Sequence, residues 1–119
     1  MFTFERLDVW QKAISFADLV YSLPRSFPTD ERFGLTNKMR RAAVSIPSNI
    51  AEGQARRTTG EFVQFVSYAE GSVAELDTQL HLSIQLSLIT AQQADPCFHL
   101  LDDLRRMLNG LRRKLSPPA

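Results

Sequence analysis

The segment RAAVSIPSNIAEG, residues 41–53, decides the fold because it combines a helical pattern with two features that an ordinary helix lacks. Its apolar residues recur at spacings of three and four, as they do along one side of a helix. A proline, Pro47, stands inside this pattern, and polar residues lie beside the apolar ones. Their spacing of four, four, three and four places them on one helical face. The predicted polar stripe consists of Arg41, Ser45, Asn49, Glu52 and Arg56.

Pro47 is expected to bend this helix. It has no N–H to donate to the carbonyl of Ala43, and its ring clashes with that carbonyl, which costs about 3 kcal/mol if nothing adapts. A kink is the usual response. The small side chains of Ala42, Ala43 and Ser48 leave room for one. The sequence therefore predicts a kinked helix at this point.

The polar stripe allows two interpretations. In the first, an arginine pairs with Glu52 and Asn49 hydrogen-bonds across helices, so that the stripe is a structural network. In the second, Ser45, Asn49 and Glu52 contact a small molecule in a pocket under the kink at Pro47. The structural interpretation is favoured, because buried polar groups need partners and such networks can fix the register of helices.

Two segments toward the N-terminus are predicted to be the first and second helices. The apolar series of the first runs from Val9 to Leu23, with Asp8 as its cap and Pro24 as its stop. The second contains the opening segment and is expected to begin with Thr36 as its cap. Gly53 is a candidate terminator of this second helix, although the following QARR sequence could extend it by a turn.

Two further helical patterns follow. The third helix is predicted to start with a capping box of Thr58 and Glu61, and its apolar residues continue to Ile89. If unbroken, residues 58–89 would form a helix on the order of 45 Å long. The fourth helix has apolar residues spaced over 97–115 and two candidate starts. These starts are Thr90 with Gln93, and Asp95 with Pro96.

Four amphipathic helices with short connections predict an all-α protein, an antiparallel up-down-up-down four-helix bundle. No segment shows the period of two that strands require. The chain is expected to be a single domain, 1–119, with an N-terminal apolar arm at 1–7 and a tail at 116–119. The phenylalanines of the arm should dock on this subunit or a neighbour. The loop after the first helix should pack down through Phe27 and Phe33.

Composition points to a cytoplasmic protein. Cys97 is the only cysteine, so no intramolecular disulfide can form, which fits a reducing compartment. The first residues do not show the basic start and apolar run of a signal peptide. No stretch of 18 consecutive apolar residues is present, so a membrane span is not expected.

The net charge of +1 conceals a segregation of charges along the chain. Residues 58–104 carry seven acids and no Lys or Arg, whereas residues 105–114 carry five bases and no acid. The bases could form a face that binds nucleic acid. Alternatively, bases at helix C-termini complement the helix dipole and solvate the surface, which is the favoured interpretation. The candidate nucleic-acid contacts are Arg56, Arg57, Arg105, Arg106, Arg112, Arg113 and Lys114.

The sequence predicts no catalytic residue, no metal site and no cofactor. Neither His81 nor His99 lies in an E-x-x-H or H-E-x-x-H motif, which argues against di-iron bundles and zinc proteases. A phosphate-binding glycine loop and a C-x-x-C motif are also missing. Cys97 falls on the apolar stripe of the fourth helix, where packing is its expected role.

Three segments carry a resemblance to a known family: LDVWQKA (7–13), FGLTNKMRRAAVSIPSNIAEG (33–53) and EFVQFVSYAEGSVAELDTQL (61–80). They resemble the four-helix-bundle proteins encoded in intervening sequences of bacterial large-subunit ribosomal RNA genes. That family is in turn similar to the accessory variability determinant of diversity-generating retroelements. The similarity extends from about Phe4 to Leu115. The matching signature residues are Arg40, Arg41, Ser45, Ile46, Asn49, Ile50, Ala51, Glu52 and Gly53.

The resemblance implies an antiparallel bundle that assembles into a ring-like homopentamer without known enzymatic activity. The retroelement relatives resemble a basic barrel that binds nucleic acid and a reverse transcriptase. The near-neutral charge of this chain predicts only weak non-specific attraction to phosphates. The main hypothesis is therefore a non-enzymatic homo-oligomeric scaffold whose partner is itself. The alternatives are an accessory protein that binds RNA, DNA or a nucleic-acid-handling protein, and small-molecule binding near Pro47.

Overall fold

The computed structural model describes residues 4–23, 27–28 and 32–116, and these contain four α-helices and no strand. This confirms the predicted all-α class. A short 3₁₀ turn, η1, precedes the first helix, and a π-helical turn, η4, leads into the second. The elements are η1 (Phe4–Arg6), α1 (Asp8–Ser22), η4 (Arg32–Thr36), α2 (Asn37–Gln54), α3 (Thr59–Gln85) and α4 (Ala91–Leu115).

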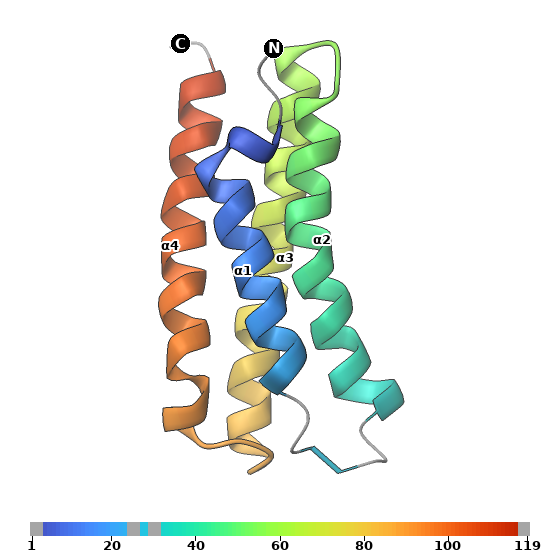
Figure 1. The fold of residues 1–119 in the computed structure, drawn as a ribbon, viewed down its shortest axis with the longest axis vertical. Coiled ribbons are helices and arrows are strands. Elements are labelled where there is room, and N and C mark those ends of the chain that lie inside the picture. The colour runs from blue at the N-terminus through green and yellow to red at the C-terminus, as the bar shows by residue number, and fades with distance from the viewer. Residues whose placement is uncertain (1–3, 24–26, 29–31, 117–119) are drawn as a thin grey trace.

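The four helices lie side by side in an elongated bundle measuring 46 × 23 × 20 Å (Figure 1). Each helix packs on the next one along the chain, and α1 also packs on α4. α1 ends and η4 begins at the end of the bundle where α3 connects to α4, and the connection from α2 to α3 lies at the other end (Figure 1). Connections at alternating ends are what the expected up-down-up-down order requires.

The apolar stripes predicted from the sequence meet along the axis of the bundle. Each helix contributes a fully buried side chain, such as Phe16, Ile46, Leu76 and Leu104. Burying a side chain of this size stabilises the fold by roughly 1.5–3 kcal/mol. The polar Ser83 is also buried, and its hydroxyl donates to the carbonyl of Gln79 at 2.8 Å, so it is satisfied locally.

Local capping signals set the starts of α3 and α4. The Thr58 hydroxyl accepts a hydrogen bond from the Glu61 amide at 3.1 Å, which is one half of the predicted capping box; the Glu61 carboxylate accepts from the Thr58 hydroxyl at 2.9 Å and not from its backbone amide. At α4 the box is complete: Thr90 accepts from the Gln93 amide at 3.0 Å, and the Gln93 side chain accepts from the Thr90 amide at 2.8 Å. Of the two candidate starts, the structure therefore selects Thr90, and Pro96 lies inside α4.

The third helix does not continue unbroken to Ile89. It ends at Gln85, and Ser87 adopts a positive φ of 61°, which an L-residue rarely does within regular structure. This conformation turns the chain back toward the bundle. Ile89 is then buried from the loop instead of from a helix.

The expected caps of α1 and α2 are wrong. Asp8 is the first helical residue of α1, and the capping position belongs to Leu7, which makes no side-chain cap bond. Thr36 occupies the capping position of α2 but has helical angles, φ −55° and ψ −50°, and makes no side-chain cap bond. The reason is that η4 already supplies a helical turn before α2. The predicted stop of α1, Pro24, lies outside the described residues.

Gly53 does not terminate α2, which continues to Gln54. Gly53 is instead buried where α2 crosses α3. A β-carbon built there would lie 2.7 Å from Cβ of Phe65, 3.0 Å from Cδ1 of Phe62 and 3.3 Å from the Phe62 carbonyl oxygen. The glycine is therefore required for the close approach of two helices rather than for a turn.

The N-terminal arm docks on its own subunit at Phe4, whose ring lies edge-on to Trp10 with the centroids 5.3 Å apart. Phe2, in the same arm, lies outside the described residues. In the loop after α1, Phe27 is buried as expected. The side chain of Phe33 is not among those described. The bundle thus covers its core with aromatic residues from outside the main helices.

Candidate functional site

The polar stripe begins inside the interface between α2 and α3. The Ser45 hydroxyl donates to the carbonyl of Ala42 at 3.0 Å and is hydrogen-bonded to the hydroxyl of Ser72 on α3. Asn49 donates from Nδ2 to the carbonyl of Ser45 at 2.8 Å, within its own helix. The expected bond from Asn49 across helices is therefore not the one observed. The contact that does cross to α3 comes from Ser45.

The rest of the stripe faces outward. Arg41 and Glu52 are exposed, and Glu52 has no cation within 4.0 Å among the described residues. The guanidinium of Arg56 lies 4.6 Å from the centre of the Phe65 ring, a cation–π distance. The stripe thus makes two separate contacts with α3, from Ser45 and from Arg56, and is not the single network with a paired Glu52 that the sequence predicted.

Pro47 and Ser45 lie on different sides of α2 and line different grooves. α2 continues as a helix on both sides of Pro47, which lines a shallow groove against Trp10 and Ile14 of α1. Ser45 lines a different groove, on the side of α3. Neither groove is lined by Asn49 or Glu52. The contacts expected for a small molecule under Pro47 are therefore not brought together.

A larger feature follows the line where α2 and α3 meet. Two hollows, of about 530 and about 470 Å³, adjoin there, because Lys38 and Glu75 line both. We call them together the seam groove. Its apolar end is formed by Gly34, Leu35, Leu82 and Leu86, and its polar end by Arg41, Ala42 and Ser45; Thr78 and Gln79 lie between. Sequence reasoning missed this groove because Lys38, Leu82 and Glu75 fall off the core stripes.

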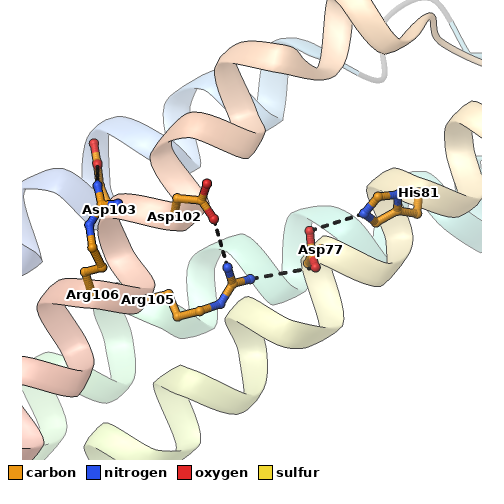
Figure 2. Close-up of polar contacts among 6 residues, drawn as sticks. All are labelled: Asp77, His81, Asp102, Asp103, Arg105 and Arg106. Carbon is orange, nitrogen blue, oxygen red and sulfur yellow. Dashed lines mark hydrogen bonds and ion pairs between the residues drawn. The ribbon is translucent and has the colours of Figure 1, made fainter.

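Three of the predicted nucleic-acid contacts are neutralised by carboxylates. Figure 2 shows Arg105 between Asp102, at 2.9 Å, and Asp77 of α3, at 3.7 Å. Arg106 pairs with Asp103 at 2.6 Å. Asp103 also accepts from Lys12 of α1 at 3.3 Å, and these cations lower the pKa of its carboxyl below the ordinary 3.8, with the Lys12 hydrogen bond the largest cause. These pairs join α4 to α1 and α3.

The third neutralised base is Arg112, which donates from Nε to Glu70 of α3 at 2.9 Å. In contrast, Arg57, Arg113 and Lys114 have no carboxylate within 4.0 Å among the described residues. They lie at the end of the bundle that holds the α2–α3 connection and the C-terminal end of α4 (Figure 1). Packing of α4 on α3 thus recombines charges that are segregated along the sequence.

The titratable side chains offer little chemistry. Cys97 is buried, and this burial raises the pKa of its thiol to about 11, so almost no thiolate forms near neutral pH. His81 and His99 are exposed and lie near Asp77 and Asp95, at 3.7 and 3.2 Å. Within the described residues, no three His, Cys, Asp or Glu side chains are placed to hold a metal ion.

Large apolar side chains are exposed on the outside of the bundle. Each of six retains 43% or more of its surface in contact with solvent. Single exposed apolar residues are common, whereas groups of them mark interaction surfaces. None of the helices described is both long enough and apolar enough to cross a membrane. The six are Ile14, Tyr21, Val44, Tyr68, Leu82 and Leu86.

Comparison with known proteins places this arrangement in a family. The fold matches the crystal structure of a protein with unknown function from the S23 ribosomal protein family of Bacteroides thetaiotaomicron, with a TM-score of 0.81 and 21% identity. That match covers 88% of this chain and 95% of the other. No curated protein matches the sequence. The family model described as 23S rRNA-intervening sequence protein matches residues 5–110, and the chain therefore belongs to this family.

Proposed function

We propose that the protein is a non-enzymatic scaffold in which the up-down-up-down bundle assembles with copies of itself into a closed ring, with five subunits as the expected number. The observation that carries the proposal is the group of large apolar side chains on the outer surface of the bundle. They lie on α1, α2 and α3 and, in the case of Leu86, directly after α3; none lies on α4. A subunit with apolar residues on more than one face suits head-to-tail contacts, which generate rings when the rotation closes.

Light scattering coupled to size exclusion tests the proposal. At micromolar concentration we expect a species of five times the 13.5 kDa of one chain. A closed ring gives the same mass over a range of concentrations, because every interface is satisfied. A strictly monomeric species would contradict the scaffold. A dimer or an open series of masses would contradict the ring.

A second candidate function is binding of RNA or DNA, or of a protein that handles them, at the basic end of the bundle. It is supported by Arg57, Arg113 and Lys114, which come from two distant segments, lie at one end, and have no carboxylate within 4.0 Å in the described part of the chain. In a ring this weak patch would be repeated on every subunit, and avidity would strengthen it. A single near-neutral subunit would bind weakly.

Titration of a labelled structured RNA at about 50 and about 200 mM salt tests this candidate, since phosphate contacts lose affinity as salt rises. Replacing Arg57 and Arg113 by Ala should weaken binding and reduce the salt dependence. The matched control replaces Arg105 and Arg106 by Ala. It removes the same amount of charge, but from two arginines that are already paired with carboxylates. Absence of binding at low salt, or equal effects of the two double variants, would contradict the assignment.

A further inference from the structure

The apolar end of the seam groove has the size and lining of a small-molecule pocket. Its volume is about 530 Å³, and such pockets measure roughly 300–1,000 Å³. Gln79, Leu82 and Leu86 are spaced three and four along the chain, so they line it from one side of α3. Leu35, from the turn before α2, lines it as well. From Gln79 to Leu86 this lining extends about 10 Å, which suits a hydrocarbon chain of roughly ten carbons.

One buried polar atom beside the apolar end lacks a hydrogen-bond partner among the described residues. It is Oε1 of Gln79, a residue that is only 8% exposed. Nε2 of the same amide donates to Glu75 only at 3.5 Å, which is longer than an ordinary hydrogen bond. A buried acceptor without a donor is unfavourable, and the terminal torsion of a glutamine is broad. Gln79 can therefore turn its oxygen toward an N–H group placed in the groove.

Two bases lie where the apolar end of the seam groove meets the polar end. Lys38 lines both hollows and Arg41 lines the polar one, and both side chains are exposed. Neither has a carboxylate within 4.0 Å among the described residues. Glu75 is the single acid in the lining of the groove, so positive charge is in excess there. The groove therefore offers two cations to an anion at the end of an apolar surface.

We propose that the seam groove binds an N-acyl amino acid, which carries an apolar chain, an amide N–H and a carboxylate in that order. The acyl chain lies against Leu82 and Leu86, and the amide N–H donates to Oε1 of Gln79. The carboxylate faces Lys38, with Arg41 one helical turn farther along. These groups follow one another along the groove in the order in which they occur in the ligand.

An alkyl chain suits the apolar end better than a peptide does. An extended peptide brings an N–H and a C=O at every residue, and these need partners when they are buried. The polar side chains between the two ends are few, and the Thr78 hydroxyl already donates to the carbonyl of Ala74 at 2.9 Å. This site is separate from the groove at Pro47, and it goes beyond the proposed assembly without requiring it.

Isothermal titration calorimetry of the full chain with N-decanoylglycine, below its micelle concentration, tests the proposal. We expect one molecule to bind per chain. Two analogues each change one feature: decanoyloxyacetic acid has an ester oxygen in place of the N–H, and decylamine carries the opposite charge. The ester should bind roughly tenfold more weakly, because it offers no donor to Gln79. Decylamine should bind at least about tenfold more weakly, because it meets Lys38 and Arg41.

Substitution of Gln79 tests the hydrogen bond separately from the fold. Gln79→Leu should bind N-decanoylglycine and its ester analogue equally, because the acceptor that distinguishes them is gone. A purely structural role of Gln79 would lower stability without changing this preference. Circular dichroism of the variant confirms that the helices remain. A preference for the amide that survives in Gln79→Leu would overturn the assigned hydrogen bond.

The charge and the apolar lining each have a matched control. Lys38→Met should weaken binding roughly tenfold and reduce its salt dependence, whereas Lys114→Met removes the same charge at the other end of the bundle and should change neither (Figure 1). Leu82→Ala should also weaken binding roughly tenfold. Its control is Val44→Ala, because Val44 is 43% exposed, close to the 45% of Leu82, but does not line the seam groove. Unchanged affinity in Lys38→Met and Leu82→Ala would overturn the site.

The outcomes separate this inference from the proposed function. Binding of N-decanoylglycine to a chain that is monomeric by light scattering would support the site and refute the scaffold. A chain that assembles but does not bind N-decanoylglycine would overturn the site and leave the scaffold standing. If Leu82→Ala then lowers the mass of the assembly, a second copy of the chain occupies the groove instead. Equal binding of all three compounds, or binding of micelles alone, would overturn the proposed class of ligand.

Discussion

At Gly53 a single absent methyl group determines how closely α2 can approach α3. The nearest neighbour of a β-carbon at this position would be Cβ of Phe65, which is fixed to the α3 backbone and cannot rotate away. A contact of this kind can be relieved only by moving one helix. The sequence shows a glycine near the end of a helix, which is typical of a terminator. Only the position of the neighbouring helix reveals its packing role.

Replacing Gly53 by Ala should destabilise the protein by about 1–3 kcal/mol, because overpacking outweighs the gain in helix propensity of up to about 1 kcal/mol. Urea denaturation measures the change. Gly110→Ala is the matched control, since it lies inside α4 and no atom outside the adjoining turns of that helix lies within 4 Å of the added carbon. The control should be neutral or stabilising by about 0.5–1 kcal/mol. Equal effects of the two substitutions would contradict the close-approach explanation.

The polar stripe shows the limit of prediction for individual side chains. Helical spacing correctly places Ser45 and Asn49 on one side of α2, because that depends only on the geometry of one helix. Their hydrogen bonds depend on what lies opposite. Ser72 of α3 meets Ser45, and among the described residues no partner across the interface meets Asn49, which donates to the Ser45 carbonyl of its own helix instead. The pattern of one helix contains no information about that opposing surface.

At the scale of elements, the sequence predicts that all four helices exist, but it predicts the start of only two of them. The apolar period identifies all four, since a long stripe must be buried. The starts of α3 and α4 depend on side chains within one turn, so Thr58 and Thr90 could be recognised in the sequence. The starts of α1 and α2 depend on the preceding turns η1 and η4, which no local motif announces.

Removing the cap of α4 should cost a measurable part of the stability. Thr90→Ala deletes the hydroxyl that accepts from the Gln93 amide and should reduce the free energy of unfolding by about 0.5–2 kcal/mol. Thr59→Ala is the control, because Thr59 is an exposed residue in the first turn of α3 and not its cap. Thermal unfolding followed by circular dichroism compares them. A cost as large for Thr59→Ala would show that the cap is not the cause.

At the scale of the whole molecule, ion pairs connect helices that the sequence keeps apart. Lys12 of α1 and Asp103 of α4 are one such pair, and Glu70 of α3 and Arg112 of α4 are another. A run of acids and a run of bases in the sequence suggest a polarised molecule. Because α3 and α4 pack together, much of that polarity is cancelled in space. Sequence charge alone could not predict this, since it requires the helix pairing.

Asp103 should make stability depend on acidity. The pKa of Asp103 is lower in the folded chain than in the unfolded chain, where it has its ordinary value. The ionised carboxylate therefore contributes to stability at any pH above the ordinary pKa. This contribution is lost as the pH falls through the pKa of the folded chain. Asp103→Asn should therefore show a smaller fall in melting temperature than the wild type between about pH 6 and about pH 3. Lys12→Met, which removes the largest cause of the shift, should change the pH dependence in the same direction. An unchanged pH dependence in both variants would refute the pairing.

The contrast between the capped and uncapped helices also has a consequence for synthesis on the ribosome. The N-terminal half of the chain emerges first, yet α1 and α2 make no side-chain cap bonds of their own. The last half to emerge contains α3 and α4, whose beginnings are fixed by residues within one turn. A hairpin of such helices can form from nearby contacts, which is the fast route to structure. We therefore expect α3 and α4 to form a helical hairpin soon after they leave the exit tunnel, and α1 and α2 to gain their full stability only when they pack on it.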